Sequence, residues 1–185
     1  YYAQVQELAF AVPVLQLVSG EIADLAAQVR HIDTIDRGAI LRVEFGNCLN
    51  PVQLVSRVRA VLPEVVVWLD LGWTKDLILR EVWASQILAT YGEDEPEREI
   101  VVSGSSFPAS FEPARRSVAE AQERRLFDVL VRAHNSVAPV YGDWGSTRAP
   151  REPSVMRTVK RIDLPAQREW IFFRSDGTED YRDLA

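Results

Sequence analysis

Carboxylates stand at the ends of apolar segments that we predict to be strands, namely Glu44, Asp70 and Asp143. Oxygen ligands of this kind suit a hard divalent cation such as Mg²⁺ or Mn²⁺. Carboxyl groups in different environments can also divide the roles of general acid and general base. The alternative is that each acid caps the following helix or binds loop amides. The hypothesis of a metal site requires that the three side chains meet at one edge of the sheet.

Hydroxyl and aromatic side chains follow two of the same strands. The loop SGSSFP places Ser105 and Ser106 beside a glycine, and its amides can bind an anion. It lacks the lysine of a P-loop and the spacing of a G-x-S-x-G elbow, so a tight turn is the alternative. In the segment YGDWG, the glycines can hold Tyr141, Asp143 and Trp144 on a fixed backbone. We expect Ser105, Ser106, Tyr141 and Trp144 to bind a ligand, with a structural loop around a buried Trp as the alternative.

Other kinds of chemistry have weaker support. The single cysteine, Cys48, has no evident histidine partner, and the two histidines are far apart in the sequence. A thiol nucleophile or a zinc site is therefore not expected. Basic residues near the C-terminus alternate with aromatic ones and predict a patch for an anion or a nucleic acid. They are Arg157, Lys160, Arg161 and Arg174, with Trp170, Phe172 and Phe173.

The elements that would position these residues alternate between short apolar runs and segments of helical period, which is the pattern of βα units. We predict strands over 12–18, 39–45, 65–69, 100–103 and 138–141. Asn50 and Pro51 begin one helix, and Ser117 with Glu120 forms a capping box before another. Runs 158–164 and 170–174 predict an antiparallel hairpin. We expect one α/β domain over 1–185, with βα units over 1–148 and an irregular segment plus hairpin over 149–185.

This pattern fits either an open doubly wound sheet or part of a (β/α) barrel, and both bind ligands at the carboxyl ends of their strands. We favour the second: consecutive βα units forming a partial or compact barrel-like parallel sheet with a C-terminal antiparallel hairpin.

The composition of the chain restricts the classes of protein to which it can belong. The chain has 185 residues, 47% hydrophobic and 26% charged, as in an ordinary globular domain. Its formal charge of -6 disfavours a general affinity for phosphate backbones. It has no apolar run long enough to span a bilayer and only one cysteine, so we expect a cytoplasmic protein without membrane association. The start at Tyr1 leads us to expect a processed chain or part of a longer one.

Short motifs give a family likeness: SSFP (105–108), ERRLF (123–127), YGDWG (141–145), WIFFR (170–174) and YRDLA (181–185). In their order and spacing the sequence resembles the Beta protein family of bacteriophages, prophages and bacterial mobile or defence loci. The resemblance implies a βα-barrel-like fold and a link to phage biology or antiviral defence, and it implies no established reaction. Family members look longer at both ends, and their later Gly-Asp and paired-His motifs are absent here.

The resemblance also marks individual positions, with roles that it does not define. Trp144 stands where the family often has another aromatic residue. The marked positions are Ser106, Phe107, Pro108, Glu123, Tyr141, Gly142, Asp143 and Arg174.

We therefore predict a protein that binds an anionic ligand, such as a nucleotide or nucleic acid, at the rim where the strands end. In an enzymatic version Glu44, Asp70 and Asp143 hold Mg²⁺ or Mn²⁺, which activates water for phosphodiester hydrolysis. Asp143, Arg174 and Glu123 are the predicted catalytic residues, and Arg174 would stabilise developing charge. The competing hypothesis is a non-catalytic interaction subunit that packs its sheet edge and apolar hairpin against another protein chain.

Overall fold

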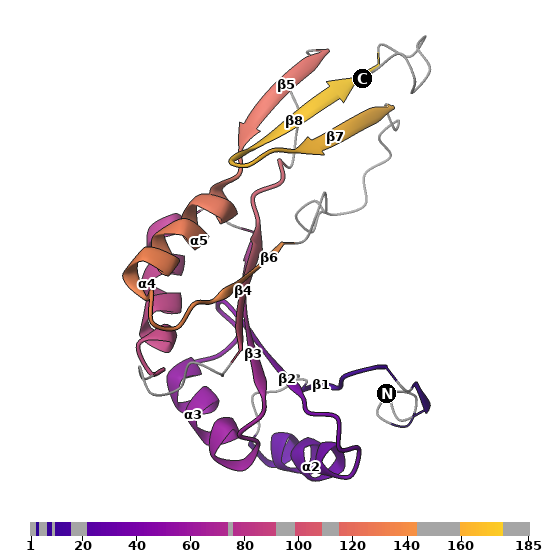
Figure 1. Cartoon of the computed structure of the whole chain (residues 1–185), viewed down its shortest axis with the longest axis vertical. Helices are drawn as coiled ribbons and strands as arrows, with labels where there is room; N and C mark the ends of the chain where they lie inside the picture. Colours follow the sequence, from indigo (N-terminus) through magenta and orange to yellow (C-terminus); the bar gives the residue numbers. More distant parts are fainter. Residues whose placement is uncertain are drawn as a thin grey trace.

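The computed structural model describes residues 3, 7, 8, 10–15, 22–73, 76–91, 99–108, 115–143 and 160–175. Within these ranges strands and helices alternate along the chain (Figure 1). In chain order the elements are β1 (Val14–Leu15), α2 (Ile22–Asp33), β2 (Ile40–Glu44), α3 (Pro51–Val61), β3 (Val66–Trp73), α4 (Leu77–Leu88), β4 (Ile100–Ser105), β5 (Arg116–Glu120), α5 (Gln122–Ala133), β6 (Val140–Asp143), β7 (Arg161–Pro165) and β8 (Glu169–Arg174).

Five of these strands form a parallel sheet in the order β1-β2-β3-β4-β6. The order of the strands across this sheet is the same as their order along the chain. Among the described strands, this order does not reverse. A doubly wound sheet reverses its order in the middle, whereas a (β/α) barrel adds its strands in sequence. The predicted α/β class and the consecutive βα units are therefore confirmed, and the order is that of part of a barrel.

The helices pack on one side of this sheet because successive right-handed crossovers in one direction keep to the same side. Figure 1 shows α3, α4 and α5 along that side. Alternate strand residues such as Leu41, Leu69 and Val102 are buried in one cluster with residues of α2, α3, α4 and α5. The pattern of alternation therefore gives the sheet one apolar, helix-covered face.

The start of α3 is as the sequence predicts. The Asn50 side chain accepts a hydrogen bond from the Gln53 amide at 3.1 Å, and Pro51 is the first helical residue. Helix α4 is capped by Asp76, which accepts from the Leu79 amide.

A second sheet is antiparallel, in the order β5-β8-β7. The predicted hairpin is confirmed as β7 and β8, but it is joined by β5, where we expected a capping box formed by Ser117 and Glu120. That expectation is wrong. Residues 116–120 alternate between exposed and half-buried positions and pair with β8 along their whole length, so pairing within the sheet outweighs the local helix signal.

The antiparallel sheet lies beyond the end of β4 (Figure 1) and packs on a small apolar cluster. Phe107 is fully buried and contacts Trp170 and Phe172 edge to face, with ring centroids 5.3 and 5.5 Å apart. Ala121 completes this cluster, which is separate from the core beneath the parallel sheet. Phe107, which follows β4, therefore fixes the hairpin of β7 and β8 to a strand that lies more than fifty residues earlier in the chain.

In the described ranges, none of the helices combines the length and the apolar character that a membrane crossing needs. Most of the predicted irregular segment, 149–159, and the final residues, 176–185, lie outside the described residues.

Candidate functional site

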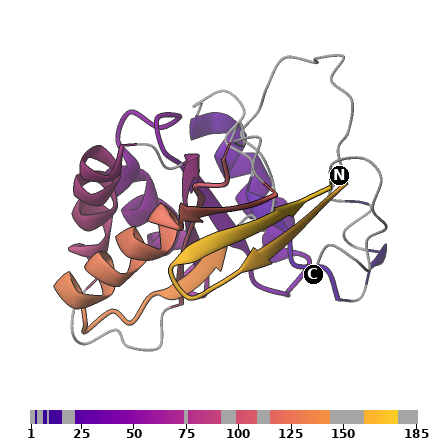
Figure 2. The same cartoon turned by 90° about the horizontal axis from the view of Figure 1, so that it is seen from above.

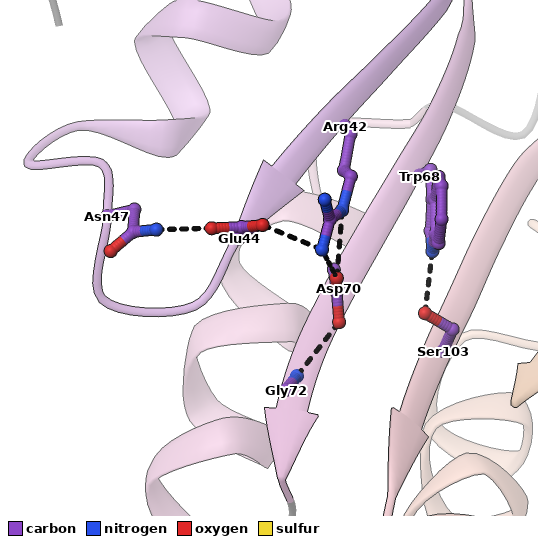
Figure 3. A network of polar contacts seen from close by, with 7 residues as sticks. All are labelled: Arg42, Glu44, Asn47, Trp68, Asp70, Gly72 and Ser103. Carbon is purple, nitrogen blue, oxygen red and sulfur yellow. Dashed lines mark hydrogen bonds and ion pairs between the residues drawn. The ribbon is translucent and has the colours of Figure 1, made fainter. Parts of the chain in front are cut away.

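The parallel sheet has a second face that carries polar side chains near its carboxyl end. Alternate residues of β2 and β3 point to it, because neighbouring side chains on a strand point to opposite faces. In register, Glu44 of β2 lies beside Asp70 of β3, and Asp70 lies beside Ser103 of β4. We call this surface the open face and define it by Arg42, Glu44, Trp68, Asp70 and Ser103 (Figure 3) together with Gly142, which is in register with Ser103.

Asp70 is the buried anchor of the open face. Its side chain is only 1% exposed, and its Oδ2 accepts hydrogen bonds from both Nε, at 2.9 Å, and Nη2 of Arg42. Its Oδ1 accepts from the Gly72 amide at 3.0 Å. Gly72 has a φ of +64°, in the region that favours glycine. Both carboxylate oxygens are therefore used, and the guanidinium of Arg42 is held along one edge.

Glu44 contacts the same guanidinium from the strand that carries Arg42, β2. Its Oε1 lies 2.7 Å from Arg42 Nη2, its Oε2 accepts from the Asn47 amide nitrogen, and its side chain is 37% exposed. Arg42 is exposed to the same extent. Because an ion pair with this exposure is screened by solvent, Glu44 is held much less firmly than Asp70.

Trp68 and Ser103 extend the open face toward β4. The indole Nε1 of Trp68 donates to Ser103 Oγ at 2.6 Å, and the guanidinium carbon of Arg42 lies 5.1 Å from the centre of the Trp68 ring. Both contacts orient the half-buried ring. The open face thus combines a fixed cation, a half-buried aromatic ring, the buried hydroxyl group of Ser103 and the partly exposed carboxylate of Glu44.

Nη1 of Arg42 is the group best placed to bind a ligand. Asp70 and Glu44 engage Nε and Nη2, and among the described residues no hydrogen bond or ion pair reaches Nη1. A guanidinium that is fixed along one edge can offer its remaining N–H groups to a phosphate or carboxylate oxygen with little loss of entropy.

Asp143 lies on the other side of the sheet. Gly142 is in register with Ser103, and a Cβ at Gly142 would be only 3.0 Å from the Ser103 Cβ, so Gly142 belongs to the open face. Its neighbour Asp143 therefore points to the helix-covered face. The structure brings Glu44 and Asp70 together and separates Asp143 from them.

These residues do not fit the predicted Mg²⁺ or Mn²⁺ site. A guanidinium occupies the place between Glu44 and Asp70 where a cation would be shared. Across the described ranges, no three His, Cys, Asp or Glu side chains are grouped so that they could hold a metal ion.

The serines of the SGSSFP loop have structural partners. Ser105 is buried, and its Oγ accepts from the Phe107 amide at 3.2 Å. Ser106 Oγ accepts from the Gln122 amide at 2.9 Å and lies 3.2 Å from the Glu120 carbonyl oxygen, to which it donates. Ala121, the residue before α5, offers no side-chain cap. Ser106 therefore supplies the cap of α5 from a distant loop. The predicted ligand contacts of Ser105 and Ser106 stay predictions.

Glu123 is buried in the first turn of α5, where the helix dipole favours an acidic group. Its Oε1 accepts from Trp170 Nε1 at 3.2 Å, whereas its Oε2 has no hydrogen-bond partner in the described part of the chain. Glu123 thus links α5 to the antiparallel sheet. Its predicted catalytic role stays a prediction, on a side chain that is closed to solvent.

Tyr141 belongs to the helix-covered face. Its ring contacts Phe127 edge to face at 5.1 Å, and the guanidinium carbon of Arg124 lies 4.5 Å from its centre. Burial, with the negative charges of Glu123 and Asp143, raises the pKa of the Tyr141 hydroxyl from 10.0 to about 12. Tyr141 is therefore a neutral hydroxyl group near neutral pH.

The described residues of the predicted basic patch lie in or beside the antiparallel sheet. Arg174 ends β8 and is in register with Arg161 of β7, while Trp144 and Arg157 lie outside the described residues. Trp170 and Phe172 are buried against Phe107 and cannot stack on a base. Of the aromatic side chains in the predicted basic patch, Phe173 alone is partly exposed.

The sequence analysis did not single out Arg42 or Trp68. The signal was available, because both stand two residues before a carboxylate that was singled out, Glu44 and Asp70. A period of two places each pair on one face of a strand.

A family model described as Beta protein matches residues 2–185, nearly the whole chain. Comparison with curated proteins and with solved structures gives no match.

Proposed function

The chain belongs to the Beta protein family, and within that family we propose that it binds a small anionic ligand on the open face. The ligand carries a phosphate or carboxylate group, and a nucleotide is the class that we favour. The observation that carries this proposal is the guanidinium of Arg42, which Asp70 holds along one edge while the side chain stays 37% exposed.

The role of Asp70 is to position Arg42. Since Asp70 is buried and both of its oxygens accept hydrogen bonds, it is not available to the ligand. Hydrogen bonds to charged groups contribute about 1.5–3 kcal/mol each, so the pair gives Arg42 a fixed direction.

Glu44 acts as an internal competitor. With Asp70 and Glu44 both in contact, Arg42 is surrounded by more negative than positive charge. A ligand phosphate that approaches Nη1 must also repel or displace Glu44, and the partly exposed Glu44 can turn toward solvent.

The size of the ligand follows from charge. A net charge of -6 opposes a long polyanion more strongly than a small one. The Trp68 ring beside Arg42 adds an aromatic surface for a heterocycle. These two features favour a nucleotide over a nucleic acid. The phage or antiviral-defence setting is supported by the family likeness alone.

Calorimetric titration with inorganic phosphate, with ATP and with a single-stranded oligonucleotide tests the proposal and separates the ligand classes. Arg42→Gln should weaken binding about 10- to 100-fold, the loss of one charge-assisted hydrogen bond. Arg57→Gln is the matched control, because Arg57 is exposed on α3 and its substitution changes net charge equally. Equal binding by these two variants, or no binding of any of the probes, would overturn the proposal.

Two further variants test the roles of the acids. Glu44→Gln should bind phosphate several-fold more tightly than the wild type, since it removes the competing charge. Glu64→Gln, on an exposed loop residue, controls for the change in net charge. Asp70→Asn should weaken binding by releasing the guanidinium, and circular dichroism will show whether this variant keeps its fold.

A further inference from the structure

The antiparallel sheet has an outer face that is apolar in the middle. Residues that are directly opposite in an antiparallel pair share a face. In register, Val118 of β5 lies beside Ile171 of β8, which lies beside Leu164 of β7. The row before it holds Arg116, Phe173 and Ile162, and the row after it holds Glu120 and Glu169. We call these residues the outer face.

The outer face is accessible. Val118 is 45% exposed and Leu164 is 43% exposed, while Ile171 and Phe173 are half-buried. The opposite face of the same sheet already packs on Phe107. In the view from above, the hairpin presents its broad side with no helix or strand drawn over it (Figure 2). These apolar side chains form one continuous row across the three strands.

Charges of opposite sign lie in the rows on the two sides of the apolar row. Arg116 lies on one side, and Glu120 with Glu169 lies on the other. Within the described residues, neither the side chain of Arg116 nor that of Glu169 has a hydrogen bond or an ion pair, and the side chain of Glu120 pairs only with the exposed Arg125, at 3.4 Å. Glu120 and Glu169 are direct neighbours across the strands, which is unfavourable unless a cation approaches.

We propose that the occupant of the outer face is a second copy of this chain. Two sheets that pack face to face can be related by a two-fold axis that lies between them and runs across the strands. This operation places the apolar rows on each other and sets Arg116 of each chain over Glu120 of its partner. A two-fold contact requires such self-complementarity, and the order of basic, apolar and acidic rows provides it.

The dimer should be weak. A patch of three short strands has a footprint on the order of 250 Å² from ordinary strand spacings. A stable interface buries about 800 Å² on each partner. We therefore expect association that is measurable at roughly 10–1000 µM and that weakens as salt screens the two charge contacts.

Sedimentation velocity across this concentration range tests the proposal on the full chain. The wild type should shift from monomer toward dimer as its concentration rises. Arg116→Glu and Glu120→Arg should each weaken association about tenfold, since each creates two repulsive contacts in the symmetric dimer. The control Arg132→Glu reverses a charge on an exposed residue of α5 and should leave association unchanged.

Mixing gives the decisive result. When the Arg116→Glu protein is mixed with the Glu120→Arg protein, each contact across the two-fold axis of the mixed dimer again joins opposite charges. The two variants should therefore associate with each other more strongly than either does with itself. This result cannot come from misfolding of either variant. A wild type that stays monomeric at millimolar concentration, or a mixture that behaves as the separate variants do, would overturn the proposal and leave the face to a different protein.

Discussion

The two sheets of this protein leave opposite kinds of surface uncovered. The parallel sheet buries its apolar face under helices and leaves a polar face with Arg42, Glu44 and Trp68 partly exposed. The antiparallel sheet buries a few residues around Phe107 and leaves an apolar row with Val118 and Leu164 exposed. A fixed cation beside a carboxylate is suited to a small polar ligand, whereas an exposed apolar row is suited to another protein surface. Ligand binding and self-association can therefore coexist on one chain without competing for residues.

The sheets also differ in how their stability is supplied. The helix-covered core draws on every helix from α2 to α5, whereas the second cluster consists of Phe107, Ala121, Trp170 and Phe172. Loss of one large side chain should therefore affect the small cluster more selectively than the large core.

Phe107→Ala is the strongest test of this difference. Removal of a buried Phe typically costs about 3–5 kcal/mol of unfolding free energy. We expect hydrogen exchange to accelerate in β5, β7 and β8 far more than in β2 and β3. Leu69→Ala, a buried substitution in the parallel sheet, should instead accelerate exchange throughout. Identical exchange patterns in these two variants would show that the sheets unfold as one unit.

Ser106→Ala addresses the connection between the sheets. Its hydroxyl group caps α5 from the loop after β4, and loss of a cap typically costs about 0.5–2 kcal/mol. Urea denaturation should show this loss, and Ser106→Thr should restore most of it. The control Ser136→Ala, on an exposed residue, should stay within about 0.5 kcal/mol of the wild type. A Ser106→Ala variant as stable as this control would contradict the capping role.

The smallest expected effect concerns pH and the helix-covered face at β6. Because the folded-state pKa of Tyr141 is raised to about 12, folding favours its protonated form. The resulting stability is fully present below pH 10 and is lost as pH rises from 10 toward 12. Urea denaturation at pH 8, 10 and 11 should show a steeper decline for the wild type than for Tyr141→Phe. Parallel declines would indicate that water reaches this hydroxyl group as freely as it reaches the open face.

Much of the fold could be predicted from period and composition. The runs around Ile40, Val66 and Ile100 are apolar enough to require cover, and strands with intervening helical segments imply a parallel sheet. The register could not be predicted, because it depends on pairing between strands that are distant in sequence. The Ser117 and Glu120 pair shows the limit of local rules. Their spacing matches a capping box at the start of a helix, but in the structure both residues belong to β5, which pairs with β8.

The candidate site could be predicted only in part, because it also depends on how the strands pair. Glu44 and Asp70 were singled out as strand-end acids, and the structure pairs them in register on neighbouring strands. Asp143 also ends a strand, but the face to which it points follows from its position relative to Gly142 and not from its type. Arg42 was not singled out, because an arginine within a strand is expected to be a solvated residue. Its buried partner Asp70 becomes evident only when the two strands are paired.

The sequential strand order has a consequence for how such a chain can change in evolution. In a sheet where every strand lies next to its predecessor, a whole βα repeat can be gained or lost at an outer strand without rethreading the rest. Homologous proteins can therefore differ by complete repeats and still keep Arg42, Asp70 and Ser103 side by side, because those residues come from three neighbouring strands in the interior of the series.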